Sequence, residues 1–545
     1  MHENIKRIIT TVAVTAIIGS VLAGCKATPK TLPKVNNTIP AAVSYPIKTD
    51  KVLTYWAYMN TATPGAGFGN DYGNLPMYKE LQKETGVTIK FIHPAIGQEV
   101  EQFNLLLASG DLPDMIEYNW MSYPGGPEKA ISDKVITPLN DIMNKETPNL
   151  KKVLAKDVGL NKMVKTDTDK YYVFPFSRGS NEDKSLLVFD GLTIRKDWLD
   201  KLGLKVPTTI DEWHTVLTAF KTKLNVQSPF CMWDYMNQMK VMPVFVGAFG
   251  AYEDFFLDDK GKVQFGPIQP GYKDYIATMA QWYKEGLIDK DWATNNRKAV
   301  DAKVLASKTG ATYGGNGSSL GKYIDTMKKD DPTFNLVGAP YPTLKAGDKP
   351  EFGHLAYQYS GGTGSVAISA TSSNKDLAAE WLDYAYGSKG HMLFNFGIEG
   401  QSYTMVDGKP KYTDLIMNNP NKIPVASIMA AYTRSSFNGP FVQDPNYFTQ
   451  YTANPVQQEA VKIWGNTNEA KHLLPPVTPS PTESTQMSTI MNDVTTYRTE
   501  MLTRFILGQE PMSNYDAYVA QIKKMGIDTA IKINQSALDR YNKRK

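Results

Sequence analysis

The stretch that indicates the fold class runs from residue 51 to residue 118 and reads KVLTYWAYMNTATPGAGFGNDYGNLPMYKELQKETGVTIKFIHPAIGQEVEQFNLLLASGDLPDMIEY. Three of its segments have the apolar pattern of strands, and two repeat apolar residues every three or four positions, as helices do. The expected order is strand 51–56, helix 75–85, strand 87–91, helix 99–109 and strand 113–118. Alternating strands and helices are typical of an α/β layer with a parallel sheet.

The same alternation resumes further along the chain. The expected elements are helices over residues 194–202, 272–285, 377–385 and 487–505, a capping box at residues 209–212 and a strand at residues 366–368. Asp258 to Gly261 is expected to form a hairpin turn, since its ligand spacing differs from that of a calcium-binding EF-hand. A chain of 545 residues is long enough for at least two lobes with separate cores.

The N-terminus has the pattern of an export signal. Residues 2–7 are basic, residues 8–18 are apolar, and VLAGC follows at residues 21–25. The apolar run is too short to span a bilayer of about 30 Å, so we expect cleavage before Cys25 and attachment of lipid to Cys25. The alternative is a plain signal peptide in which Cys25 is incidental. Residues 26–50 are rich in proline and lysine and are expected to tether the folded body to the outer face of a bacterial, Gram-positive cell membrane.

Composition excludes several functional classes. The formal net charge is only +4, and the basic residues are not clustered, so nucleic acid is not an expected partner. Apart from Cys25 only Cys231 remains, which excludes a disulfide framework and indicates a core residue. No histidine pair has zinc-binding spacing and no nucleophile elbow is present, so we expect neither a metal, nor a cofactor, nor an enzyme. With 30 Tyr and 9 Trp, the exported chain fits carbohydrate or peptide binding.

Six segments, in this order and spacing, resemble a known family: FNLLLASGDLPD (103–114), KYYVFPF (170–176), RKDWLDKLGLKVPTTIDEW (195–213), YKEGLID (283–289), NFGIEGQSY (395–403) and FILGQEP (505–511). They resemble the family 1 extracellular solute-binding lipoproteins of ATP-binding-cassette sugar importers, in the branch related to maltose- and alginate-oligosaccharide-binding proteins. The resemblance implies a monomeric α/β protein with the two-lobe, periplasmic-binding-protein-like type II clamp and mixed sheets flanked by helices. It would close around an oligosaccharide and be recognised by the permease subunits.

The resemblance also implies where the chain crosses between lobes. The crossings are expected near Phe174–Pro175, between residues 341 and 359, and between residues 400 and 412. The first lobe would then comprise residues 51–174 and about 350–405, and the second lobe about 175–349 and 406–545.

Sugars are bound by aromatic faces and by planar polar groups, and open α/β sheets expose their clefts at the carboxyl ends of strands. The candidates at such positions, in the Gly-rich turns and just after the first crossing are Trp56, Tyr58, Tyr118, Trp120, Arg178, Tyr313, Asn316, Glu399 and Tyr403. The resemblance adds Trp233 and Tyr235. For each aromatic residue the alternative is packing in a core, and Trp120 and Trp233 are the strongest candidates. Arg178 and Arg434 would suit an acidic sugar, because a guanidinium group pairs with a carboxylate.

The sequence leaves two other functions open. An oligopeptide-binding lipoprotein would also need export, two lobes and a wide cleft, but it would bind the charged ends of a peptide. A surface glycoside hydrolase would need a pair of carboxylates, and no motif indicates one.

Overall fold

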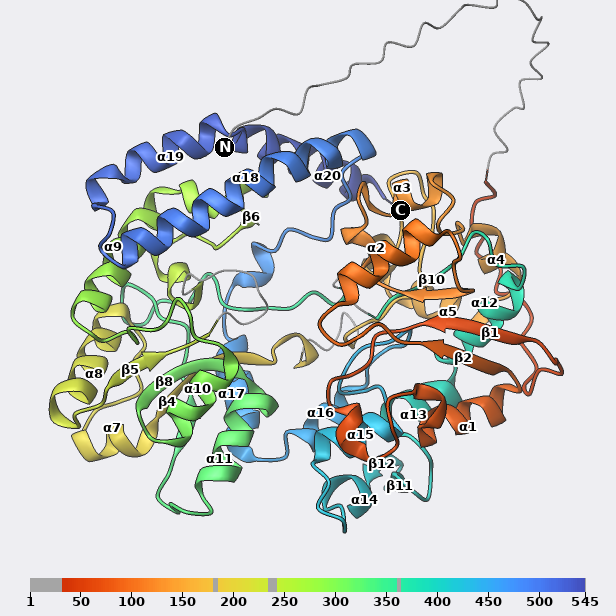
Figure 1. Cartoon of the computed structure of the whole chain (residues 1–545), viewed down its shortest axis with the longest axis horizontal. Coiled ribbons are helices and arrows are strands. Elements are labelled where there is room, and N and C mark those ends of the chain that lie inside the picture. The colour runs from red at the N-terminus through yellow and green to blue at the C-terminus, as the bar shows by residue number, and fades with distance from the viewer. Residues whose placement is uncertain (1–31, 180–184, 234–242, 360–363, 545) are drawn as a thin grey trace, which may run out of the picture. The chain divides into compact units, whose positions relative to one another are not determined.

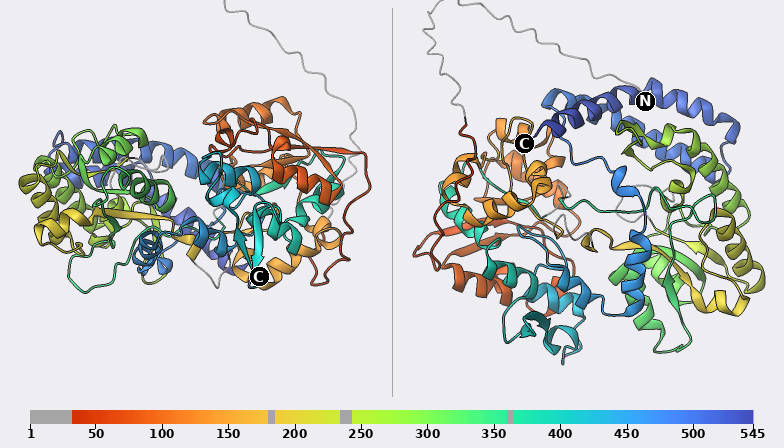
Figure 2. Two further views of the ribbon diagram at one scale, coloured as in Figure 1. Left: turned by 90° about the horizontal axis from the view of Figure 1, so that it is seen from below. Right: turned by 180° about the vertical axis from the view of Figure 1, so that it is seen from behind.

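The computed structural model describes residues 32–179, 185–233, 243–359 and 364–544. Residues 34–545 form one compact unit, and two hydrophobic cores divide it into two lobes (Figure 1). The first lobe consists of the described residues of 34–176 and 359–451, and the second lobe of those of 188–355 and 456–544. Figure 2 shows the same lobes from below and from behind.

A four-stranded sheet forms the centre of the first lobe. Its strands are β1 (Val52–Trp56), β2 (Thr88–Ile92), β3 (Met115–Glu117) and β10 (Val366–Ile368), in the order β10-β3-β1-β2. β1 runs parallel to β2 and β3, whereas β10 pairs antiparallel with β3. The parallel pairs follow from the expected strand–helix–strand order, and the distant β10 makes the sheet mixed.

The second lobe is built on another four-stranded mixed sheet. Its strands are β4 (Asp190–Arg195), β5 (Ser228–Cys231), β8 (Thr309–Gly315) and β9 (Leu336–Gly338), in the order β5-β8-β4-β9. β5 and β8 are parallel, and β4 is antiparallel to β8 and β9. These two mixed sheets with their helices confirm the predicted α/β two-lobe fold.

Helices cover both sheets. Those of the first lobe are α1 (Pro76–Thr85), α2 (Glu99–Ser109), α3 (Gly126–Ser132), α4 (Asn140–Lys145), α5 (Pro148–Lys156), α6 (Val158–Met163), α12 (Lys375–Tyr384), α13 (Ser388–Phe396), α14 (Asp414–Met417), α15 (Val425–Tyr432) and α16 (Pro445–Tyr451). Those of the second lobe are α7 (Lys196–Leu202), α8 (Ile210–Lys223), α9 (Pro270–Lys284), α10 (Arg297–Leu305), α11 (Lys322–Met327), α17 (Pro455–Gly465), α18 (Pro481–Ile506), α19 (Tyr515–Lys524) and α20 (Ile527–Lys543). The predicted capping box of α8 is present between Thr209 and Glu212.

The hairpin predicted at Asp258 joins β6 (Phe255–Leu257) and β7 (Val263–Phe265). The Asp258 carboxylate accepts the backbone N–H groups of Lys260 and Lys262, both at 2.9 Å. Its oxygen therefore stabilises the turn. Within the described ranges no group of three or more His, Cys, Asp or Glu residues could hold a metal ion.

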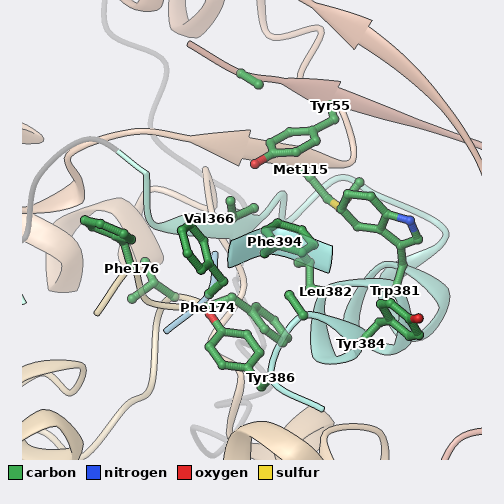
Figure 3. Close-up of a cluster of buried hydrophobic side chains, with 14 of the residues drawn as sticks. Tyr55, Met115, Phe174, Phe176, Val366, Trp381, Leu382, Tyr384, Tyr386 and Phe394 are labelled. Atoms are coloured by element: carbon green, nitrogen blue, oxygen red, sulfur yellow. The ribbon is translucent and has the colours of Figure 1, made fainter. Parts of the chain in front are cut away.

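The core of the first lobe joins segments that are far apart in the sequence (Figure 3). Trp381 of α12 meets Tyr55 of β1 edge-on, with ring centroids 5.9 Å apart, and Phe174 lies beside Tyr386 at 6.3 Å. In the second core Cys231 is buried, and burial raises the pKa of its thiol. The inert thiol agrees with its predicted packing role.

The last crossing lies later than expected. Residues 412–451 pack in the first core, and membership of the second core resumes at Val456. β11 (Tyr403–Val406), β12 (Lys409–Tyr412) and α14 to α16 therefore belong to the first lobe, where the Tyr412 hydroxyl donates to the Asn395 carbonyl at 2.6 Å. The resemblance implied a boundary near residue 406, whereas the packing of residues 412–451 puts this boundary after residue 451.

The expected tether is also shorter than residues 26–50. From Lys34 onward the chain lies against the first lobe: Lys151 donates to the Thr38 carbonyl at 2.6 Å, and the Tyr45 hydroxyl donates to the Glu380 carbonyl at 2.6 Å. Cys25 and the signal segment lie outside the described residues. In the part of the chain that is described, no helix combines the length and the apolar character needed to cross a membrane.

The C-terminal helix α20 links the second lobe to the first. Asp167 of the first lobe accepts from Arg540 Nε at 2.6 Å and from Arg544 Nε at 3.0 Å. Arg544 also donates to the Lys162 carbonyl at 3.0 Å. Beside these contacts, Met163 of α6 packs against a small cluster that contains Leu538 and Tyr541.

Candidate ligand-binding site

The carboxyl ends of β1 and β3 bring four of the predicted aromatic residues together in the first lobe. Ring centroids are 5.2 Å apart for Trp56 and Tyr58, 6.5 Å for Tyr58 and Tyr118, and 5.9 Å for Tyr118 and Trp120. The adjacent parallel strands end at the same edge of the sheet, which explains the clustering. We call Trp56, Tyr58, Tyr118 and Trp120 the aromatic group.

Members of the aromatic group differ in what they can offer a ligand. Trp120 has no exposed surface, and its ring is covered by Phe103 and Tyr123. We therefore assign Trp120 to the core, which corrects its place among the strongest ligand candidates. Tyr58 and Tyr118 retain 7% and 5% exposure, and burial raises the pKa of both phenols. Each therefore stays a neutral hydroxyl that can donate a hydrogen bond.

Arg178 is held at the first crossing between two aromatic rings. Its guanidinium carbon lies 5.3 Å from the centre of the Phe176 ring and 5.0 Å from that of Phe189. Its backbone N–H donates to the Gln358 carbonyl at 2.9 Å, and the Gln358 amide donates to Asp157 at 2.6 Å. Two crossing segments therefore fix the position of Arg178.

The predicted residues Arg178 and Tyr313 are connected through two residues that sequence reasoning missed. The Phe189 ring lies 6.0 Å from the His354 ring, and that ring lies 6.3 Å from the ring of Tyr313. Neither Phe189 nor His354 belongs to a motif with recognisable spacing, so only their proximity reveals them. We call Arg178, Phe189, His354 and Tyr313 the crossing group.

His354 is charged in this environment. Its Nδ1 atom contacts the Asp190 carboxylate, whose side chain is fully buried. Burial alone would lower the pKa of His354, but Asp190, with Glu253 and Glu469 nearby, raises this pKa to about 9. Burial also raises the pKa of Glu253 to about 7. The site therefore combines an imidazolium donor with a carboxyl group that is partly ionised near neutral pH.

A small cavity lies beside the crossing group. Its volume is about 20 Å³, and its polar lining comes from Tyr252, Glu253, Tyr313, Tyr341 and His354. A space of this size holds one water molecule or one ligand hydroxyl group.

Ser365, which directly precedes β10 in the first lobe, ties the end of β3 to the first crossing. The Ser365 carbonyl accepts the backbone N–H of Tyr118 at 3.2 Å, and the Ser365 hydroxyl accepts that of Phe176 at 3.1 Å. The end of β3 and the first crossing are therefore fixed side by side.

The remaining predicted residues do not join these groups. The Asn316 amide donates to the Gln457 carbonyl at 2.7 Å and accepts from its side chain at 2.9 Å, which indicates a packing role. Glu399 and Tyr403 line a separate cavity of about 400 Å³ on the first lobe. Trp233 is half-buried against the second core, and Tyr235 lies outside the described residues.

Arg434 is not available to an acidic ligand. It is 3% exposed, and its Nη2 atom donates to Glu117 Oε1 at 2.9 Å. This buried ion pair uses the group that the sequence suggested for a uronate.

Comparison with known proteins gives consistent results. The chain is 24% identical over 529 residues to the fructooligosaccharide transporter substrate-binding protein FusA of Streptococcus pneumoniae, covering 92% of this chain and 93% of FusA. It is 24% identical over 376 residues to the lipoprotein LipO of Bacillus subtilis, covering 66% of this chain and 70% of LipO. The crystal structure of the alginate-binding protein AlgQ2 without calcium superposes with a TM-score of 0.72 at 26% identity, over 90% of this chain and 99% of AlgQ2.

Residues 71–392, more than half of the chain, match the bacterial extracellular solute-binding proteins. The two mixed sheets, the three crossings between the lobes, and the aromatic and crossing groups agree with that match. The chain belongs to the family of bacterial extracellular solute-binding proteins.

Proposed function

We propose that the protein captures an oligosaccharide outside the cell and delivers it to the permease of an ATP-binding-cassette importer. The observation that carries the proposal is the placement of two groups of side chains beside the crossings. Tyr58 and Tyr118 of the first lobe supply neutral phenols. Arg178, His354 and Tyr313, next to the second lobe, supply a guanidinium, an imidazolium and a phenol. The names of FusA and AlgQ2, which describe fructooligosaccharide and alginate binding, support the same class of ligand.

The chain's own residues explain how a sugar would be held. The neutral hydroxyl groups of Tyr58 and Tyr118 would donate hydrogen bonds to sugar oxygens. Arg178 and His354 supply charged donors from the other side. Rotation of the lobes about the crossings would bring the groups onto the ligand, and the closed form of this monomer would be the one that the permease recognises. No covalent bond is made or broken.

A melting-temperature screen against neutral oligosaccharides, acidic oligosaccharides and oligopeptides tests the proposal. A ligand at a thousand times its dissociation constant stabilises the folded state by about 4 kcal/mol. For lobes of this size the expected shift is on the order of 10 °C. The sugar should be recovered unchanged after long incubation. A shift with peptides alone would favour the oligopeptide-binding alternative, and cleaved sugar would establish a hydrolase.

We also propose that Cys25 carries the lipid that anchors the protein to the outer face of the membrane of a Gram-positive cell. The short apolar signal with VLAGC at residues 21–25 and the likeness to the lipoprotein LipO support this. Cys25→Ser should release a folded protein into the soluble fraction, while Cys231→Ser should leave fractionation unchanged. A Cys25→Ser protein that stays in the membrane fraction would contradict the anchor.

A further inference from the structure

The second lobe places an imidazolium and a carboxyl group around one hydroxyl-sized space. His354 and Glu253 both line the cavity of about 20 Å³ and both retain partial exposure. Asp190, which holds the Nδ1 side of the His354 ring, has no exposed surface. The Nδ1 atom is therefore committed to Asp190, and the other ring nitrogen is the one left to act on a ligand.

The neighbours of His354 make it a donor. Because Asp190 accepts at Nδ1 and keeps the ring protonated, Nε2 also carries a hydrogen. Glu253 supplies an acceptor at the same cavity. A charged donor and an acceptor around one space match a single sugar hydroxyl group, because a hydroxyl can accept from His354 and donate to Glu253.

We propose that His354, positioned by Asp190, and Glu253 form a subsite of the second lobe that binds one hydroxyl group of an uncharged sugar residue. This inference rests on the proposed function and specifies its ligand. Asp190 acts through His354 as a positioning residue, while His354 and Glu253 contact the sugar.

Charge around the subsite selects against acidic sugars. Among the described residues, four carboxyl groups lie at or beside the cavity, on Asp190, Glu253, Asp254 and Glu469, and the cations that act on Glu253 are His354 and Arg498. A uronate carboxylate in the subsite would be repelled, because like charges in a poorly hydrated site interact strongly. The guanidinium carbon of Arg178 lies 5.0 Å from the centre of the Phe189 ring, and Arg178 does not line the cavity.

The titratable groups near the subsite set its pH dependence. They are Asp190, Tyr252, Glu253, Asp254, Tyr313, Tyr341, Glu469, Arg178 and Arg498. Burial raises the pKa values of Tyr313 and Tyr341, so these phenols stay neutral. Affinity for a neutral sugar should rise as Glu253 ionises around pH 7 and fall as His354 loses its proton around pH 9.

The test is calorimetric titration of the full mature chain with the neutral oligosaccharide found in the screen and with a uronic oligosaccharide of equal length. His354→Gln should weaken neutral-sugar binding about ten- to a hundredfold and remove the fall in affinity above pH 9. Glu253→Gln should remove the rise around pH 7. The control is His214→Gln, whose histidine pairs with Glu285 at 2.6 Å on the surface of the same lobe. It should bind as wild type does.

Asp190→Asn provides the readout for positioning. It should weaken binding and move the upper limb of the pH profile downward, which a purely structural role would not do. The melting temperature of each variant separates a lost contact from a lost fold.

Two results would overturn the inference while the proposed function stands. One is a His354→Gln protein that binds the neutral sugar within twofold of wild type with the same pH profile. The other is tighter binding of the uronic oligosaccharide than of the neutral one. Failure of the wild type to bind any oligosaccharide would instead overturn the proposed function and this inference together.

Discussion

The substitution Arg434→Met tests the assignment of Arg434 to the core of the first lobe. Arg434 donates to Glu117 at 2.9 Å and to the Tyr78 hydroxyl at 3.0 Å, and the Tyr55 hydroxyl donates to Glu117 at 2.7 Å. The Glu117 side chain is fully buried and that of Arg434 is 2% exposed. Removing the guanidinium would leave a buried carboxylate with one phenol donor and no cation.

Breaking a buried ion pair at one partner costs about 3–5 kcal/mol. At about 2–4 °C per kcal/mol, the first lobe should melt on the order of 10 °C lower. Thermal and urea unfolding measure the loss, and calorimetric titration measures sugar affinity on the same sample.

A surface pair provides the matched control. Arg504 contacts Glu510 at 2.8 Å with 41% of its side chain exposed, so Arg504→Met should cost less than about 1 kcal/mol. The double variant Glu117→Met/Arg434→Met should recover part of the loss, because no unpaired charge remains. An Arg434→Met protein as stable as wild type but unable to bind sugar would refute the reasoning and make Arg434 a ligand-binding residue.

Three further predictions concern packing, the link between the lobes and pH. Trp120→Ala should lower the free energy of unfolding by about 3–5 kcal/mol through the cavity it creates; an equally stable variant with weaker sugar binding would return Trp120 to the binding site. Asp167→Asn should lower the free energy of unfolding by about 1–3 kcal/mol, because the buried Arg544 loses its carboxylate partner. In solution scattering, an unchanged radius of gyration of the ligand-free variant would show that this contact does not restrain opening of the lobes. Asp383 accepts the Leu150 N–H at 2.7 Å, and burial raises the pKa of this carboxyl group to about 7. Between about pH 4 and pH 7 the folded state keeps a proton that the unfolded chain has lost, so the stability of the wild type should fall as pH rises through this range. In urea titrations the Asp383→Asn variant should lack this fall. A fall of equal size in the variant would assign the pH dependence to another group.

Local sequence patterns predicted individual elements well where their signals are short-range. The helix expected over residues 99–109 is α2 with the same bounds, and the capping box of α8 forms as expected. The helix expected from residue 194 begins at Lys196 instead, because Ile194 and Arg195 pair with neighbouring strands in β4. Hydrogen bonding between distant strands decided that boundary.

The candidate site shows the same division. Placing ligand candidates at strand ends correctly brought Tyr58 and Tyr118 together, because parallel strands end at one edge of their sheet. The same rule included Trp120, which turns inward onto Phe103, and it missed His354, which lies outside any strand. Strand direction is a local property, but the direction of a side chain beyond the strand depends on what packs around it.

The sequence by itself determined the export pattern, the alternation of strands and helices and the resemblance to a solute-binding family, because each can be read from residue types and their order along the chain. Only the tertiary structure decided that residues 412–451 belong to the first lobe, that Arg434 is paired with Glu117 and that His354 lies between Asp190 and Phe189. The physical reason is that burial and charge pairing arise between segments tens to hundreds of residues apart. An apolar or charged side chain shows what kind of partner it needs, and the packing of the two sheets determines which partner it meets.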